Sequence, residues 1–217
     1  MTLCKGMRPL WLLLAVGCAL YANSLSNPFV FDDHEAILNN ESIRQIVPSD
    51  AETQGLPTDG RPLVRLSFAI NYALSGYEVA PFRAVNLALH IFCSWLCWAV
   101  LRRVLTDGKA LVAAVIWLIH PLNSECINYI SQRSEQLMAL CYLAVLYAAQ
   151  RAVSDRPRWI WEGACVVSCV AGMACKESMV TAPALIALYD RVYLFDSWRS
   201  AWVQRWRIYV GLMASWL

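Results

Sequence analysis

Long runs without a charged side chain dominate the pattern of polar and apolar positions along the chain. Residues 9–31 and 84–101 contain no Asp, Glu, Lys or Arg. About 20 apolar helical residues are needed to cross the hydrocarbon core of a bilayer, so both runs qualify as spans. Shorter uncharged runs follow, and Arg, Trp and Tyr residues lie at their ends. This succession is typical of a protein with several spans, whose ends carry polar residues into the interior of the bundle. The shorter uncharged runs are 110–124, 136–150, 163–175 and 178–189.

The pattern predicts an all-α fold, a polytopic transmembrane helical bundle. Residues 25–60 contain several Pro and Gly residues, which predicts a long first extracytoplasmic loop. Residues 61–76 repeat Leu and Ile at steps of three and four, with arginines elsewhere, which predicts an amphipathic interfacial helix. The helices are expected at about 8–24, 61–76, 81–104, 109–120, 124–152, 158–174, 177–193 and from 205 onward.

The composition supports a membrane protein. The chain is 59% apolar and 16% charged, whereas soluble domains are about 25% charged. A soluble all-helical core is the alternative. The first apolar run is long for a signal peptide and more spans follow, so we expect an uncleaved first helix. The chain is still apolar at Leu217, so residues 1–217 are expected to be a single N-terminal part of a membrane domain that is truncated within a helix.

The charges predict an orientation. If the N-terminus is cytoplasmic and each span changes the side, 12 of the 18 basic residues lie in cytoplasmic segments and 11 of the 16 acidic residues lie outside. This distribution obeys the positive-inside rule. It explains the arginines without a nucleic-acid partner. The nine cysteines show neither a disulfide framework nor a paired metal-ligand spacing, so no metal-binding residues are predicted.

Three polar clusters interrupt the apolar pattern, and the first is NPFVFDDHEAIL at 27–38. Asp32 or Asp33 is a candidate general base at the mouth of a membrane cavity. The alternative is a solvated acidic loop with an Asx turn or a helix N-cap.

The other two clusters lie at 119–137 and 174–185. In the former, Glu125 and three more polar residues share one face of the expected helix, which suits an anionic or sugar ligand; the alternative is an interfacial helix start. In the latter, Lys176 is a natural phosphate partner; the alternative is an ordinary charged turn. All three clusters are expected on the outer side, which favours one shared site.

The segments that carry these clusters resemble a known family. NPFVFDD, RPLVRLSFAINYAL, HPLNSECINYISQRSEQLMAL and CKESMVTAPALIALYD occur in this order. The series is similar to the membrane half of the transmembrane and tetratricopeptide-repeat family. That family belongs with the polytopic, lipid-sugar-dependent glycosyltransferases of the GT-C type, which include the protein O-mannosyltransferases.

The resemblance implies roles for particular residues. One of Asp32 and Asp33 would be the catalytic base. Arg133 or Lys176 would stabilise the departing lipid phosphate. The other substrate-binding residues implied by the resemblance are His120, Glu125 and Glu177.

The resemblance implies a membrane glycosyltransferase similar to a protein O-mannosyltransferase. It would transfer a sugar from a polyprenyl- or dolichyl-phosphate donor to a hydroxyl of a protein or glycan on the non-cytoplasmic side. A divalent metal is compatible with this chemistry. The protein is expected to be surrounded by membrane lipid. The multi-pass protein is expected in a bacterial inner membrane, with the endoplasmic reticulum membrane as the alternative. The alternatives to an enzyme are a non-enzymatic transporter or scaffold, and an inactive truncated paralogue.

Overall fold

A computed structural model of the chain describes residues 3–47 and 58–216. Every regular element in these two ranges is helical and none is a strand, which confirms the all-α prediction. The chain divides into two compact units, Met1–Leu137 and Met138–Leu217. That residues 1–217 are part of a single membrane domain stays a prediction.

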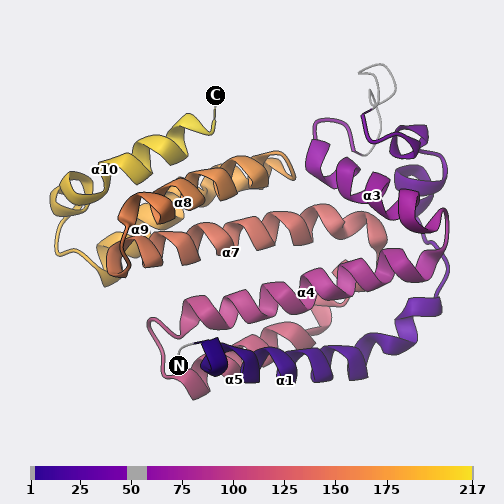
Figure 1. The fold of residues 1–217 in the computed structure, drawn as a ribbon, viewed down its shortest axis with the longest axis horizontal. Coiled ribbons are helices and arrows are strands. Elements are labelled where there is room, and N and C mark those ends of the chain that lie inside the picture. The colour runs from indigo at the N-terminus through magenta and orange to yellow at the C-terminus, as the bar shows by residue number, and fades with distance from the viewer. Residues whose placement is uncertain (1–2, 48–57, 217) are drawn as a thin grey trace. The chain divides into compact units, whose positions relative to one another are not determined.

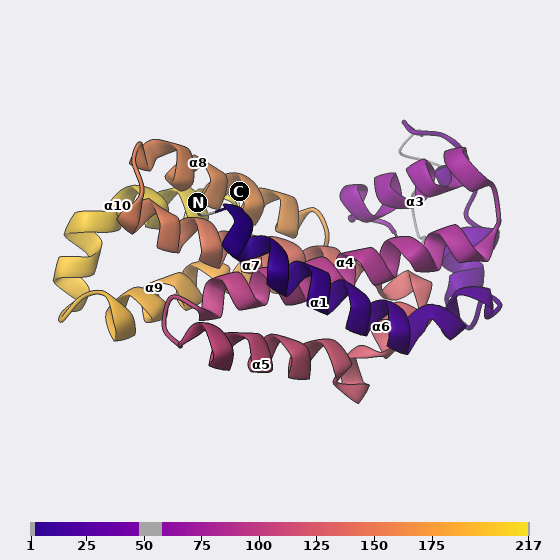
Figure 2. The same ribbon diagram turned by 60° about the horizontal axis from the view of Figure 1, so that its bottom comes forward.

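Three long helices form the body of the first unit. They are α1 (Leu3–Tyr21), α4 (Val79–Leu101) and α5 (Asp107–Ile119), which lie side by side (Figures 1 and 2). A 3-10 turn, η1 (Ala22–Ser26), continues α1. Their apolar faces meet in a common core, which Ile127 from the segment after α5 completes. The core residues on the three helices are Leu13, Tyr21, Leu87, Ile91 and Leu118.

Polar side chains on these helices bind backbone groups of their neighbours. Tyr21 donates its hydroxyl hydrogen to the carbonyl oxygen of Leu118 at 3.2 Å, and His90 Nε2 lies 3.0 Å from the same oxygen. Ser94 Oγ donates to the carbonyl oxygen of Ala114 at 2.8 Å. Polar groups in apolar helices are costly unless they are paired, so these bonds fix how α1, α4 and α5 pack.

Helix α3 (Pro62–Ser75) is the amphipathic helix predicted at 61–76. It packs against the 3-10 turn η3 (Glu41–Arg44). Arg65 of α3 is buried and bonds three carbonyl oxygens around this turn, those of Ser42, Gln45 and Ile46. Burial lowers the pKa of Arg65 below its usual value.

The opposite face of α3 is apolar and exposed. Ile70 is 48% exposed and Leu74 is 82% exposed. The helix ends at Gly76, whose φ of 58° suits a residue without a side chain. An exposed apolar face is what an interfacial helix requires, but the membrane-surface location of α3 stays a prediction.

The helix predicted over 124–152 is interrupted, and that prediction is wrong at its start. Helix α6 (Glu125–Asn128) ends at Tyr129, whose extended backbone has φ −112° and ψ 102°. The 3-10 turn η5 (Ile130–Gln132) follows, and then the long helix α7 (Arg133–Ser154). Polar periodicity alone did not reveal the break, because Tyr129 is compatible with a helix.

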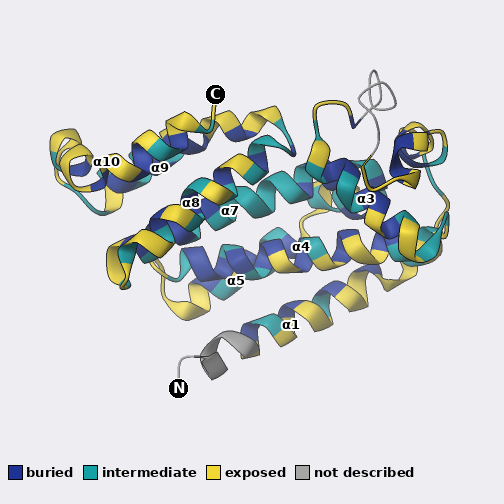
Figure 3. Cartoon of the chain, turned by 45° about the horizontal axis from the view of Figure 1, so that its top comes forward, coloured by how far each residue is buried: buried dark blue, intermediate teal, exposed yellow. Residues whose placement is uncertain are grey.

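The second unit contains α7 from Met138 onward and three further helices. They are α8 (Arg158–Met173), α9 (Ala182–Tyr193) and α10 (Trp198–Ala214), and the 3-10 turn η6 (Glu177–Thr181) precedes α9. Helix α10 packs against α8 and α9. Figure 3 shows that α8, α9 and α10 each carry buried and exposed residues, as expected for helices with one packed face.

Helix α10 starts at Trp198, before the predicted position near 205. The helix has a break at Arg205, close to the predicted start. Arg205 has non-helical φ −130° and ψ 15° and is fully buried. Its Nη1 donates to Asp190 Oδ1 at 2.7 Å, and its Nη2 donates to the carbonyl oxygen of Ala149 at 2.8 Å. Tyr209 donates to the other oxygen of Asp190 at 2.6 Å. A buried ion pair thus fixes the break to α7 and α9.

Within residues 3–47 and 58–216, three helical stretches are long and apolar enough to cross a membrane: Arg8–Ser26, Val79–Leu101 and Ile130–Ser154. A fourth span is possible by the same measure if α5 and the segment Pro121–Asn128, bent by 54°, act as one. These stretches support an integral membrane protein. Helices α8, α9 and α10 have 16, 12 and 17 residues, so the spans expected in this region stay predictions.

Gly211 permits the close contact between α10 and α8. A Cβ atom at Gly211 would lie 2.5 Å from Val166 Cγ2, closer than carbon atoms can pack. We expect Gly211→Leu to destabilise the protein by about 1–3 kcal/mol, the usual cost of overpacking. The measurement is the thermal unfolding midpoint of the purified protein. Gly163→Leu is the matched control, because nothing lies within 4 Å of its Cβ position; equal losses in both variants would contradict the prediction.

Candidate functional site

The acidic pair follows η1 on a strained piece of backbone. Phe31 has φ 47°, a positive value found at no other non-glycine residue in the described ranges. Its side chain is 86% exposed. Such a conformation costs about 1–3 kcal/mol and concentrates at functional sites. The π-helical turn η2 (His34–Leu38) comes immediately after the pair, and turns of this type also recur at functional sites.

The two aspartates have different surroundings. Asp33 is fully buried. Its Oδ1 accepts from the backbone N–H of Ser131 at 2.8 Å and its Oδ2 from that of Val30 at 3.2 Å. The guanidinium groups of Arg83 and Arg133 attract it electrostatically. Asp33 therefore ties the acidic loop to the start of α7.

Asp32 is exposed to solvent. Its backbone N–H donates to the hydroxyl of Tyr129 at 3.1 Å, and that hydroxyl also interacts with the Asp32 carboxylate. The ring of Tyr129 meets the ring of Phe31 edge to face, with 6.3 Å between the centroids. The break in the helix at Tyr129 thus places this ring beside the acidic loop, where it fixes the position of Asp32.

Arg83 near the start of α4 binds the backbone just before the acidic pair. Its side chain is fully buried, and all three of its donor groups bind carbonyl oxygens. The bonds run from Nε to Asn27 at 3.2 Å, from Nη2 to Pro28 at 2.6 Å and from Nη1 to Asn128 at 2.6 Å. Sequence reasoning missed this residue, although its place at the edge of an uncharged run was a signal.

Arg133 is fully buried as well, and its donors are occupied. Nε donates to Asn86 Oδ1 at 2.7 Å, and Nη2 donates to the carbonyl oxygen of Phe82 at 2.9 Å. Nη1 donates to the carbonyl oxygen of Ser67, and the guanidinium lies 4.6 Å from the ring centroid of Phe68. In this geometry Arg133 joins α3, α4 and α7, and its substrate-binding role stays a prediction.

His120 follows the end of α5 and Glu125 is the first residue of α6, and both are exposed. His120 caps the 3-10 turn η4 (Pro121–Asn123), because its Nδ1 accepts from the backbone N–H of Leu122 at 3.3 Å. Within the described residues, no hydrogen bond or ion pair joins either side chain to the aspartates. Their substrate-binding roles stay predictions.

Lys176 and Glu177 belong to the second unit. Lys176 is half-buried at the start of η6, and Glu177 is exposed. The structure describes their surroundings within that unit only. That all three polar clusters form one site stays a prediction.

The part of the chain that the structure describes contains no group of three or more His, Cys, Asp or Glu residues that could hold a metal ion. We therefore assign no residue to the divalent metal that the sequence left open. No disulfide joins the cysteines whose side chains the structure describes.

The chain is similar in sequence to proteins of one known family. A family described as "Dolichyl-phosphate-mannose-protein mannosyltransferase" matches residues 59–217, more than half of the chain. Protein O-mannosyl-transferase Tmtc2 of Drosophila melanogaster is 33% identical over 190 residues, which cover 79% of this chain and 20% of that protein. Protein O-mannosyl-transferase TMTC4 of Homo sapiens is 30% identical over 217 residues, which cover 84% of this chain and 29% of that protein.

A third relative, protein O-mannosyl-transferase TMTC3 of Homo sapiens, is 26% identical over 197 residues, with 85% of this chain and 22% of that protein covered. The chain thus spans less than a third of the length of the relatives it matches. No solved structure matched the chain significantly. These matches confirm the resemblance found in the sequence. They also come from animals, so they do not support the preference for a bacterial inner membrane.

Proposed function

Because the chain belongs to the dolichyl-phosphate-mannose-protein mannosyltransferase family, we propose that it carries the catalytic base of a membrane O-mannosyltransferase. The donor would be a polyprenyl- or dolichyl-phosphate sugar and the acceptor a protein hydroxyl. One observation carries the proposal. An exposed carboxylate, Asp32, is held in a fixed position by a strained backbone and by a neighbouring buried carboxylate, Asp33.

Asp32 is the base in this proposal. Its carboxylate takes the proton from a Ser or Thr hydroxyl as the hydroxyl oxygen attacks the anomeric carbon of the sugar. A bond forms between that oxygen and the anomeric carbon. The bond from the anomeric carbon to the lipid phosphate breaks, and the phosphate leaves with the electron pair. Asp32 then releases its proton to water.

Asp33, Arg83 and Tyr129 are positioning residues in this proposal. Asp33 and Arg83 bind the backbone around the loop, and Tyr129 binds Asp32 directly. Groups that must be held for reaction are more effective when their geometry is fixed before the substrate arrives. Arg133 also supports this region through α3 and α4. As the resemblance implies, the proposed cation that stabilises the departing phosphate is Arg133 or Lys176.

The proposed compartment is the endoplasmic reticulum membrane. The relatives described above come from Drosophila melanogaster and Homo sapiens, and the acidic loop is predicted on the non-cytoplasmic side. This orientation would place Asp32 where secreted and membrane proteins expose their hydroxyl groups. Accessibility labelling of a cysteine at position 32 in sealed microsomes tests the orientation. Reaction with an impermeant reagent before the membrane is opened would contradict it.

The proposed function is tested with microsomes from cells that express the protein. We expect mannose transfer to a Ser- or Thr-containing acceptor when dolichyl-phosphate mannose is supplied. We expect no transfer when GDP-mannose is supplied under conditions that prevent synthesis of the lipid donor. Direct use of GDP-mannose, or the absence of transfer from the lipid donor, would contradict the proposal.

Asp33→Asn should disturb the loop more than it disturbs the remainder of the fold. The new amide has one acceptor oxygen, so either the Ser131 or the Val30 N–H loses its partner. A buried donor without a partner costs about 1–3 kcal/mol. We expect a lower thermal unfolding midpoint together with reduced transfer. An unchanged midpoint would contradict the assigned anchoring role.

A further inference from the structure

The second unit contains a basic cavity that the proposed reaction does not use. Its volume is about 800 Å³, and it lies between the start of α8 and the second half of α10. Three arginines and one glutamate give its lining a net charge of +2. The residues that line it are Arg156, Pro157, Arg158, Trp159, Glu162, Gln204, Trp206 and Arg207.

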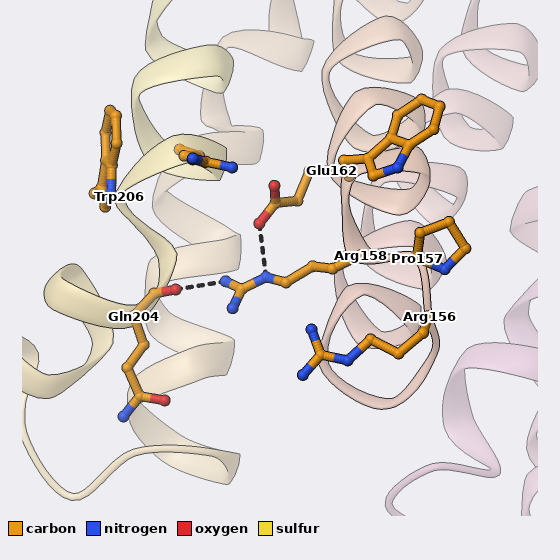
Figure 4. Close-up of a pocket in the computed structure, with 8 residues that line it drawn as sticks. Arg156, Pro157, Arg158, Glu162, Gln204 and Trp206 are labelled. Carbon is orange, nitrogen blue, oxygen red and sulfur yellow. Dashed lines mark hydrogen bonds and ion pairs between the residues drawn. The ribbon is translucent and has the colours of Figure 1, made fainter.

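One of the three arginines is part of the wall. Arg158 Nε pairs with Glu162 Oε1 at 2.6 Å, and its Nη2 donates to the carbonyl oxygen of Gln204 (Figure 4). This arginine therefore neutralises the glutamate and links α8 to α10. Arg156 and Arg207 are exposed, and no ion pair joins either to a carboxylate within the described ranges. Two positive charges thus remain for a ligand.

The break in α10 sets the position of the second exposed arginine. Arg205 at the break is held by Asp190 and by the carbonyl oxygen of Ala149. Trp206 and Arg207 come next in the chain, so this buried pair fixes where they lie on the cavity wall. The freed carbonyl group of Gln204, beside the break, accepts the bond from Arg158. The cavity wall is therefore held by a buried ion pair at the break and by the bonds of Arg158 that join α8 to α10.

Exposed tryptophans accompany the arginines. Trp159 is 69% exposed and Trp206 is 48% exposed, and both line the cavity. Trp202, half exposed, lies one helical turn before Trp206. Tryptophan concentrates at the level of lipid headgroups, because its ring is apolar and its N–H is polar. The same segments belong to the loops that the positive-inside rule assigns to the cytoplasm.

We propose that this cavity binds the phosphate headgroup of an anionic phospholipid in the cytoplasmic leaflet. Guanidinium groups bind phosphate oxygens with two parallel hydrogen bonds. Basic pockets between helices at the cytoplasmic surface are suited to such headgroups, because that leaflet carries the anionic lipids. Arg156 and Arg207 would bind the phosphate, and Trp159 and Trp206 would lie against the upper part of the lipid. The proposal does not depend on the transfer reaction.

The test uses the purified protein in detergent and native mass spectrometry. The probes are dioctanoyl phosphatidylserine, dioctanoyl phosphatidylcholine and inorganic phosphate. One basic side chain near an anionic lipid surface is worth roughly fivefold in affinity, so Arg156→Gln with Arg207→Gln should weaken phosphatidylserine binding about 30-fold. Arg103→Gln with Arg199→Gln is the matched control. It removes two exposed arginines that do not line the cavity.

Three results together would support the proposal. Arg156→Gln with Arg207→Gln weakens phosphatidylserine binding about 30-fold, and the control double variant binds phosphatidylserine within twofold of the wild type. Phosphatidylcholine binds weakly, and equally to the wild type and to both variants. Equal phosphatidylserine binding by the wild type and the first double variant would overturn it. Competition by inorganic phosphate at the same concentration as the lipid would also overturn it, because the site would then bind a soluble phosphate. Unchanged thermal midpoints in both variants exclude unfolding as the cause.

Discussion

Asp32→Asn should lower the rate of mannose transfer by about 10²–10⁴-fold, the usual contribution of a general base. The asparagine has nearly the same shape as the aspartate and keeps the backbone N–H that binds Tyr129. It cannot take a proton from the acceptor hydroxyl. The measurement is transfer from dolichyl-phosphate mannose to a Ser- or Thr-containing acceptor, at equal amounts of wild-type and variant protein in microsomes.

Glu35→Gln is the matched control for this result. Glu35 is an exposed carboxylate three residues further along, and its Oε1 accepts from Asn39 at 2.8 Å. We expect the transfer rate of this variant to stay within about twofold of the wild-type rate, because the Glu35 side chain does not take part in the proposed reaction. Asp32→Asn should also keep the wild-type thermal midpoint, since exposed side chains change stability by only about 0.5 kcal/mol. Wild-type transfer in Asp32→Asn would refute its role as the base.

Asp190→Ala should produce the largest loss of stability, about 3–5 kcal/mol. The change leaves the buried guanidinium of Arg205 without its counter-charge and removes the acceptor of the Tyr209 hydroxyl. It should also displace the second half of α10, because Arg205 lies at the break. The free energy of unfolding, from titration with a denaturing detergent, measures the effect.

A double variant separates the ion pair from simple loss of packing. Asp190→Leu combined with Arg205→Met replaces both charges by apolar groups of similar size, which often restores most of the stability. We expect the double variant to be more stable than Asp190→Ala by at least about 2 kcal/mol. If both variants lose the same stability, the charge pair is not the cause.

The sequence predicted most helices well because their signals were local. The uncharged runs located α4, α5 and α8 to within about three residues at each end. The amphipathic period located α3, and Pro62 in its first turn agrees with the usual position of proline in helices. Such patterns reflect burial of one face or of the whole helix, so they predict a helix even when the segments that pack against it are unknown.

The breaks at Tyr129 and Arg205 could not be read in this way. Neither residue is Gly or Pro, and both fit a helix by propensity. Each break is instead stabilised by distant groups: Tyr129 contacts the acidic loop about 100 residues earlier, and Arg205 binds Asp190 and Ala149. Tertiary contacts of this kind override local preference and leave no pattern along the chain.

The different surroundings of the two aspartates could not be predicted from the sequence. The sequence singled out Asp32 and Asp33 together, because adjacent carboxylates look alike without their surroundings. Burial separates them: Asp33 binds two backbone N–H groups, and Asp32 faces solvent. Arg83 was counted only as an outer charge, because its three carbonyl partners belong to segments far away in the chain.

The hydrogen bonds of Arg83 also determine when the acidic loop can fold during synthesis of the chain. The carbonyl groups of Asn27 and Pro28 emerge from the ribosome 55–56 residues before the arginine that binds them, and Ser131 follows Asp33 by 98 residues. The loop can therefore reach its final shape only after α4 has entered the membrane and the start of α7 has been synthesised. A nascent chain that carries only α1 and the acidic loop has the carboxylates but lacks the groups that hold them, so the final geometry of the loop forms late in biogenesis.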